Sequence, residues 1–193
     1  MEEGRKKIIR TNIPYRLDRL PWSSWHVLVV IALGITWILD GLEVTIVGII
    51  ASVLTKPQTL DLTTFQAAFL GTAYLIGAVV GAIVFSYLTD LYGRKKLFMV
   101  TLGTYIIGTV LSGVSWNFLS IAVFRTITGL GIGGEYSAIN SAIDELIPAR
   151  VRGWVDLAVN GSWWVGTMAG SALSLYLLNP AIFPINLGWR LSF

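Results

Sequence analysis

The amino-acid sequence predicts an all-α, polytopic membrane protein, a bundle of long apolar helices that cross a lipid bilayer. Hydrophobic residues make up 54% of the 193 residues and charged residues only 13%, whereas a soluble domain carries about 25% charged residues. Many of the twenty glycines lie inside apolar stretches, where small residues let membrane helices approach closely. The charged residues gather in short segments between these stretches, as expected of loops at the two membrane surfaces.

The apolar stretches give the order of the elements. A polar, basic tail occupies residues 1–24 and is too long for the first region of a signal peptide. Residues 25–193 form the predicted transmembrane domain, with helices at about 25–54, 62–89, 97–112, 118–146 and 151–178 and a sixth that begins near 188. Residues 97–143, read as one helix, would be about 70 Å long, more than twice the ~30 Å hydrocarbon core. They must therefore form two spans, and Gly113–Asn117 is the natural break.

The distribution of basic residues predicts the orientation. With the N-terminus inside, eleven Lys and Arg residues lie in inner segments and only two, Lys56 and Arg190, in outer segments. Cytoplasmic loops carry the excess of positive charge in membrane proteins. We therefore expect a multi-pass protein of the cell membrane with a cytoplasmic N-terminus.

Four sequence motifs occur in order along the chain: "DGLE" (Asp40–Glu43), "SYLTDLYGRKK" (Ser86–Lys96), "RTITGLGIGG" (Arg125–Gly134) and "ELIPARVRG" (Glu145–Gly153). Together they resemble the N-terminal half of the major facilitator superfamily, in its metabolite–proton symporter branch near the sugar porters. Two positions depart from the pattern: Ser86 stands where the family has Gly, and Leu91 where it has a basic residue.

The resemblance implies a carrier of twelve helices in two halves, of which this chain is the first. A C-terminal six-helix half is then an expected partner, together with the lipid bilayer, a small-molecule solute and protons. The family also uses the turn between its second and third helices as an inner gate between the halves. The residues that the resemblance assigns to this gate are Asp90, Gly93, Arg94, Lys95, Glu145 and Arg152. We expect Arg94 to reach the acids of the neighbouring inner turn, Asp144 and Glu145.

Asp40 and Glu43 are two acids inside the first predicted helix, three residues apart and so on much the same face. A charge near the centre of a bilayer costs about 2.5–3.5 kcal/mol, which is too much for a lipid-facing position. On antiparallel helices, Asp40 and Arg125 both fall about 10–15 Å below the outer surface. The sequence therefore predicts an intramembrane Asp40–Arg125 ion pair, and the related sugar porters use such a pair for proton coupling.

Proton coupling through Asp40, Glu43 and Arg125 follows from this placement. Burial favours the neutral form of a carboxyl group, whereas a nearby Arg favours its charged form. Alternating access, in which a cavity opens first to one side and then to the other, would change both conditions. The alternative is that the Asp40–Arg125 pair is purely structural and never takes up or releases a proton. Glu135 lies nearer the inner end of its helix, and we expect it to pair with Arg152.

Other polar or amphipathic side chains within the predicted spans are candidates for the substrate cavity. Packing, or an aromatic belt at the membrane surface, is the alternative explanation for each of them. The candidates are Trp37, Gln66, Tyr74, Glu135, Asn140, Asn160, Trp163 and Trp164.

The same residues argue against other functions. The chain has no Cys, one His and no nucleophile–base set, so we expect no enzyme, no metal and no cofactor. "GLGIGGE" (Gly129–Glu135) lies inside an apolar helix, whereas a nucleotide-binding glycine loop follows a strand. The basic residues are spread over short loops, so no nucleic-acid partner is expected. The predicted function is proton-coupled symport of a small organic or anionic solute by alternating access; the alternative is a truncated, non-transporting half-carrier.

Overall fold

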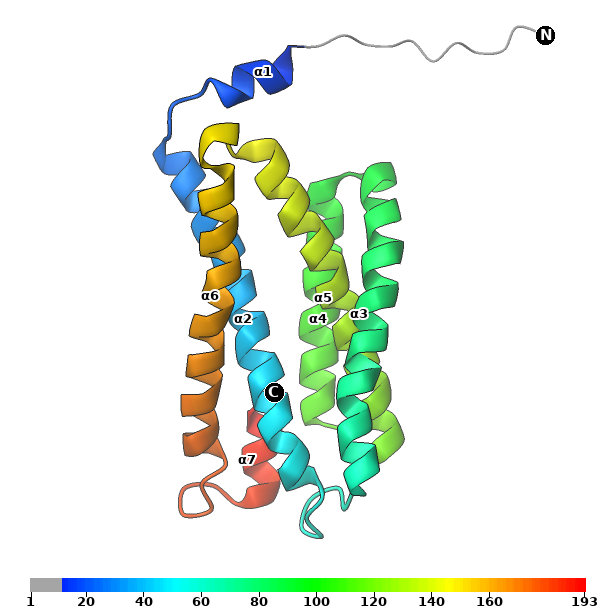
Figure 1. The fold of residues 1–193 in the computed structure, drawn as a ribbon. Coiled ribbons are helices and arrows are strands. Elements are labelled where there is room, and N and C mark those ends of the chain that lie inside the picture. Colours follow the sequence, from blue (N-terminus) through cyan, green and yellow to red (C-terminus); the bar gives the residue numbers. More distant parts are fainter. Residues whose placement is uncertain (1–11) are drawn as a thin grey trace, which may run out of the picture.

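The computed structural model describes residues 12–193, and every regular element in that range is a helix (Figure 1). The predicted all-α fold class is confirmed. Residues 1–11 of the predicted N-terminal tail lie outside the described residues. The helices are α1 Ile13–Asp18, α2 Ser24–Leu54, α3 Thr64–Tyr92, α4 Arg94–Gly113, α5 Phe118–Leu146, α6 Ala149–Leu177 and α7 Ile185–Leu191.

The turn between α3 and α4 is a single residue, Gly93. Its backbone has φ +87°, a left-handed conformation that glycine adopts without steric cost. The sequence predicts a longer break here, because the charges of "DLYGRKK" mark a membrane surface. Helical structure instead covers all of this segment except Gly93: α3 includes Asp90 and α4 begins at Arg94.

Three helices are long and apolar enough to cross a membrane: α2, α3 as far as Thr89, and α4. α5 and α6 have 29 residues each, enough for the ~30 Å core at 1.5 Å per residue. They carry more polar and charged residues, among them Arg125 and Glu135 in α5. Membrane crossing by α5 and α6, and a sixth span that starts with α7, remain predictions.

The long helices form two packed groups (Figure 1). α2 packs on α6, α3 packs on α5, and α4 packs on another side of α5; few contacts join α2 and α6 to the other three helices. The α1 end of the bundle holds the α3–α4 and α5–α6 turns. The α7 end holds the α2–α3 and α4–α5 connections. α2 and α6 therefore run in the same direction, as do α3 and α5.

Glycines form the contact surfaces of both parallel pairs. A Cβ on Gly129 or Gly133 of α5 would lie 2.1 or 2.0 Å from a carbonyl oxygen of α3, and one on Gly77 or Gly81 of α3 would lie 2.2 Å from a carbonyl oxygen of α5. No real Cβ atom approaches an oxygen so closely, so only glycine permits this helix separation. The close helix approach expected of glycines inside apolar stretches is present in this pair.

Two apolar clusters occupy the two ends of the bundle and leave its middle to polar residues. One cluster, at the α7 end, includes Ile46, Ile50 and Trp189. The other, at the α1 end, includes Leu33, Ile139 and Val159. Outward-facing side chains are also apolar: Phe65 is 78% exposed. Contact with lipid removes the cost that such a surface would have in water.

Candidate functional site

Asp40 lies in the middle of α2, where its carboxylate accepts hydrogen bonds from three other helices. Tyr74 of α3 donates to Oδ1 at 2.8 Å, and Tyr136 of α5 donates to Oδ2 at 2.5 Å. Trp163 Nε1 of α6 donates to Oδ2 at 3.1 Å. Asp40 is 1% exposed. These three donors satisfy its carboxylate, which forms no ion pair with a cation of residues 12–193.

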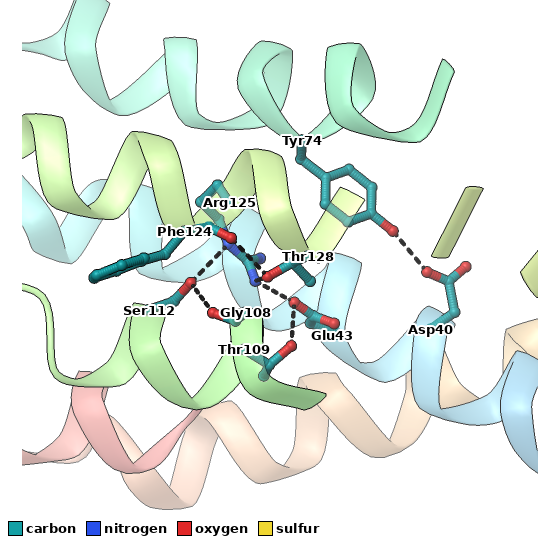
Figure 2. Close-up of polar contacts among 9 residues, drawn as sticks. All are labelled: Asp40, Glu43, Tyr74, Gly108, Thr109, Ser112, Phe124, Arg125 and Thr128. Carbon is teal, nitrogen blue, oxygen red and sulfur yellow. Dashed lines mark hydrogen bonds and ion pairs between the residues drawn. The ribbon is translucent and has the colours of Figure 1, made fainter. Parts of the chain in front are cut away.

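Glu43 and Arg125 form the ion pair of the bundle interior (Figure 2). Both side chains are buried, with exposed fractions of 5% and 1%. The Arg125 guanidinium also donates to Thr128 Oγ1 at 3.0 Å and to Ser112 Oγ at 3.3 Å. Thr109 donates to Glu43 Oε1 at 3.4 Å. A buried pair needs such additional hydrogen bonds to offset the loss of hydration.

The predicted Asp40–Arg125 ion pair is wrong, because Arg125 pairs with Glu43. Figure 2 shows Asp40 turned toward Tyr74 and away from the guanidinium. The two acids are three residues apart, which is about 4.5 Å along a helix. The depth argument from sequence could not separate positions that lie so close together.

A cavity of about 740 Å³ opens beside these polar groups, between α2, α3, α5 and α6. Asp40, Glu43 and Arg125 all contribute to its wall. Its size lies within the range of small-molecule sites, about 300–1,000 Å³. The predicted cavity residues that line it are Trp37, Tyr74, Asn160 and Trp163.

The remaining predicted cavity residues lie elsewhere. Gln66 caps the start of α3, where its side chain accepts from the Thr63 backbone N–H at 3.0 Å. Trp164 is 66% exposed on the outside of α6. Asn140 lines a second hollow, and Glu135 is buried away from both.

Tyr136 is a cavity residue that the sequence reasoning missed. It lines the cavity, stacks on Trp37 with ring centroids 4.5 Å apart, and bonds Asp40. A signal was available: Tyr136 follows Arg125 by eleven residues. Eleven residues are about three helical turns, which places both side chains on one face of α5.

The second hollow, about 690 Å³, lies between the last turns of α5 and the first turns of α6. Its wall is polar and charged, with Asn140, Asp144, Arg152 and Asp156 among its residues. Asn160 lines this hollow and the cavity alike. Its amide donates to Asp156 Oδ1 at 3.0 Å, so the two spaces meet at a fixed polar side chain.

The expected contact between Arg94 and the acids of the next turn is present at the α1 end. Arg94 and Glu145 form an ion pair of 2.6 Å between the start of α4 and the end of α5. Lys95 is exposed. The side chain of Asp90, another charged residue assigned to this gate, lies outside the described part of the structure.

The predicted Glu135–Arg152 pair is also wrong. Arg152 donates to the Ile147 carbonyl at 3.1 Å and lies 3.9 Å from Asp18 and 4.0 Å from Asp144. Glu135 is eleven residues before the end of α5, and Arg152 three residues after the start of α6. The two residues therefore differ by about 12 Å in depth, and neither carboxylate oxygen of Glu135 has a hydrogen-bond partner among the described residues. Among residues 12–193, no three His, Asp or Glu side chains are close enough to hold a metal ion.

Comparison with known proteins supports the resemblance that the motifs indicate. The family model described as "Sugar (and other) transporter" matches residues 24–193. The chain is 28% identical to the niacin transporter NiaP of Acinetobacter baylyi, over 92% of this chain and 39% of that protein. It is 33% identical to a putative metabolite transport protein of Haemophilus influenzae, over 86% of this chain and 39% of that protein. It is 29% identical to the sialic acid transporter NanX of Escherichia coli, over 81% and 37%.

The chain thus spans less than half the length of these relatives. The match nevertheless begins at the first residue of α2 and continues to Phe193, so it includes all five long helices and the site between them. This chain therefore belongs to the sugar (and other) transporter family, within the major facilitator superfamily that its motifs resemble.

Proposed function

We propose that the chain is the N-terminal half of a proton-coupled symporter in the cell membrane, with its N-terminus in the cytoplasm, and that Asp40 accepts the coupled proton. One observation carries the proposal: a buried carboxylate with no cation partner forms part of the wall of a 740 Å³ cavity. Ionisable residues inside a membrane bundle mark ion and substrate pathways. Membership of a transporter family supports the general class of function.

Protonation of Asp40 changes the contacts between the two helix groups. Asp40 and Trp163 belong to the α2–α6 pair, whereas Tyr74 and Tyr136 belong to the α3–α4–α5 group. A tyrosine hydroxyl can reverse its role and accept a hydrogen bond, but the indole N–H of tryptophan can only donate. A proton on Oδ2 therefore reverses the Tyr136 bond and weakens the Trp163 bond, and a proton on Oδ1 reverses the Tyr74 bond. Either change alters the hydrogen bonds that Asp40 makes to the other helices. Alternating access requires such a change, because the two helix groups must move relative to each other.

The Glu43–Arg125 pair is the second polar connection between the same two groups, from α2 to α5. Because the two charges neutralise each other, the pair adds no net charge to the cavity, and the net charge of the cavity wall depends on Asp40. The pair fixes the distance between the helices. We assign Glu43 and Arg125 the role of holding the groups at a defined separation. Their pair must stretch or break when the cavity changes the side to which it opens.

The proposed solute is a small organic acid. Two of the relatives are named for niacin and for sialic acid, and both compounds carry a carboxyl group. The wall of the cavity is largely apolar and aromatic, with Trp37, Tyr136 and Trp163 as ring surfaces and Asn160 as a hydrogen-bonding group. An anionic solute is repelled by ionised Asp40 and tolerated by neutral Asp40. Solute and proton therefore favour each other's binding, which is the thermodynamic requirement of symport.

Transport by the complete carrier requires a second six-helix half, since a cavity lined by one half has no opposite wall. The alternative is that the 193-residue chain is itself a non-transporting half-carrier. Vesicles that contain the chain alone, or the chain together with a C-terminal half, test whether the second half is required: only the second kind should accumulate solute, and accumulation by the chain alone would contradict the requirement.

The coupling assignment is tested in proteoliposomes of the complete carrier with an imposed inward proton gradient and labelled niacin. Asp40→Asn should abolish uphill accumulation but retain exchange of internal for external solute, because exchange needs no net proton movement. Asp61→Asn is the matched control, since Asp61 is exposed in the α2–α3 connection and Asn tolerates its φ of +51°. Accumulation by Asp40→Asn at the level of the wild type would show that Asp40 does not carry the coupled proton.

A further inference from the structure

Glu135 of α5 is a buried acid, and neither the packing of the helices nor the proposed coupling step explains why a carboxyl group is buried there. Its exposed fraction is 0%, and neither carboxylate oxygen has a hydrogen-bond partner in the described part of the structure. Almost every buried polar group in a protein is hydrogen-bonded, so each exception requires an explanation. A carboxylate that is both charged and unpartnered in a membrane interior is the most costly state such a group can adopt.

The groups around Glu135 offer no compensating positive charge. The ionisable residues near enough to act on it are Asp40 and Glu43 of α2, Tyr105 of α4 and its own neighbour Tyr136. Two of these are acids and two are phenols. α3 approaches this turn of α5 with the ring of Phe85, which contacts Gly134.

Of the three arginines on α5 and α6, Arg150 is exposed and donates to the Leu20 carbonyl at the α1 end. The other two are occupied at other depths. Arg125 lies ten residues from Glu135, about 15 Å along the helix, and is paired with Glu43. Arg152 donates to the Ile147 carbonyl at the α1 end. Neither guanidinium can neutralise Glu135 while these contacts exist.

We propose that Glu135 is a proton-binding site, separate from Asp40, and that it holds a proton in this arrangement of the helices. The bundle interior contains three acids and one guanidinium. Glu43 and Arg125 neutralise each other, and three donors stabilise the charge of Asp40. Glu135 has neither a cation nor a donor, so a proton is the ligand that its position accepts.

The position of Glu135 links this proton to the first site. Tyr136, the next residue, donates to Asp40 Oδ2. A movement of α5 relative to α2 and α4 that admits water to Glu135 therefore also changes a donor of Asp40. The Glu135 proton is released or retained according to the packing of α5, whereas the Asp40 proton depends on hydrogen bonds from three helices.

Infrared spectroscopy of the purified chain in detergent tests the assignment directly. A neutral carboxylic acid has a carbonyl stretch that a carboxylate lacks. The wild-type chain should show this band at neutral pH, and Glu135→Gln should lose it, because glutamine has the shape of the neutral acid but no carboxyl proton. Asp61→Asn is the control and should keep the band, since Asp61 is exposed.

An unchanged band in Glu135→Gln, or no band in the wild type, overturns the proposal. A band that is lost in Asp40→Asn and kept in Glu135→Gln overturns it as well, because the proton is then on Asp40. Isotope labelling of glutamate carboxyl groups tests the same assignment in the wild-type chain without any substitution. The band should shift in frequency when glutamate is labelled. A band that does not shift belongs to a residue other than glutamate. Neither measurement involves transport, so the outcome is independent of the proposed symport.

Discussion

Gly166→Ala should destabilise the chain by separating α2 from α6. A Cβ at Gly166 would lie 2.0 Å from the Ile38 carbonyl oxygen, whereas real Cβ atoms stay beyond 3.0 Å. The two helices must therefore move apart by at least about 1.0 Å at this point. Trp163 lies one turn before Gly166, and its 3.1 Å hydrogen bond to Asp40 would lengthen to about 4.1 Å, beyond the limit for a hydrogen bond.

The expected size follows from three contributions. Overpacking costs about 1–3 kcal/mol, and the loss of a hydrogen bond to a charged group costs about 1.5–3 kcal/mol. Alanine regains about 1 kcal/mol over glycine in a helix. The net loss in free energy of unfolding should be about 1.5–5 kcal/mol.

Gly161→Ala is the matched control on the same helix, because a Cβ there has no atom within 4 Å. It should be neutral or stabilising by up to about 1 kcal/mol. Thermal unfolding of the purified chain in detergent, followed by circular dichroism, compares the two variants. Equal melting temperatures for Gly161→Ala and Gly166→Ala would refute the reasoning that close glycine contacts hold α2 against α6.

Two further predictions concern the ion pair and the orientation. Arg125→Met should destabilise the chain by about 3–5 kcal/mol, because it leaves Glu43 buried without a cation. Adding Glu43→Gln to this variant should restore most of the stability, whereas adding Asp40→Asn should not. Restoration of stability by Asp40→Asn would contradict the Glu43–Arg125 pairing. The chain has no native cysteine, so single cysteines can report topology. A cysteine at Val114, which is 57% exposed, should react with an impermeant thiol reagent in intact cells, and one at Lys95 only after permeabilisation; reaction at Lys95 in sealed cells would show that the orientation is reversed.

The sequence was sufficient for the fold because long apolar stretches and short charged segments carry that information. It was less accurate at the ends of helices, since charges mark where a membrane surface lies and not where hydrogen bonding stops. For that reason α4 begins at Arg94, three residues before the predicted start at Leu97. α1, inside the predicted basic tail, was missed for a similar reason: it has only six residues, and so short a helix leaves no periodic pattern.

The site was predicted in its residue types and only partly in its contacts. An acid and an arginine within spans implied an ion pair, but depth along a helix is known from sequence to only about one turn. Asp40 and Glu43 lie within one turn of each other, so the choice between them required the rotation of α2 about its axis. The tyrosine and tryptophan donors on three other helices satisfy Asp40, and nothing in the local sequence around Asp40 reveals donors that are distant along the chain.

The pairing of α2 with α6 has a consequence for the order in which the protein is made. Trp163 follows its acceptor Asp40 by 123 residues, and a ribosome adds about 5–20 residues per second. After Asp40 has been synthesised, about 6–25 s pass before its α6 donor exists. The first donor to appear is Tyr74, 34 residues after Asp40, and until then the carboxyl group of α2 has none of its three final partners. α2 is thus the first long helix to be made, but its buried Asp40 gains its last hydrogen-bond donor only when α6 has been synthesised.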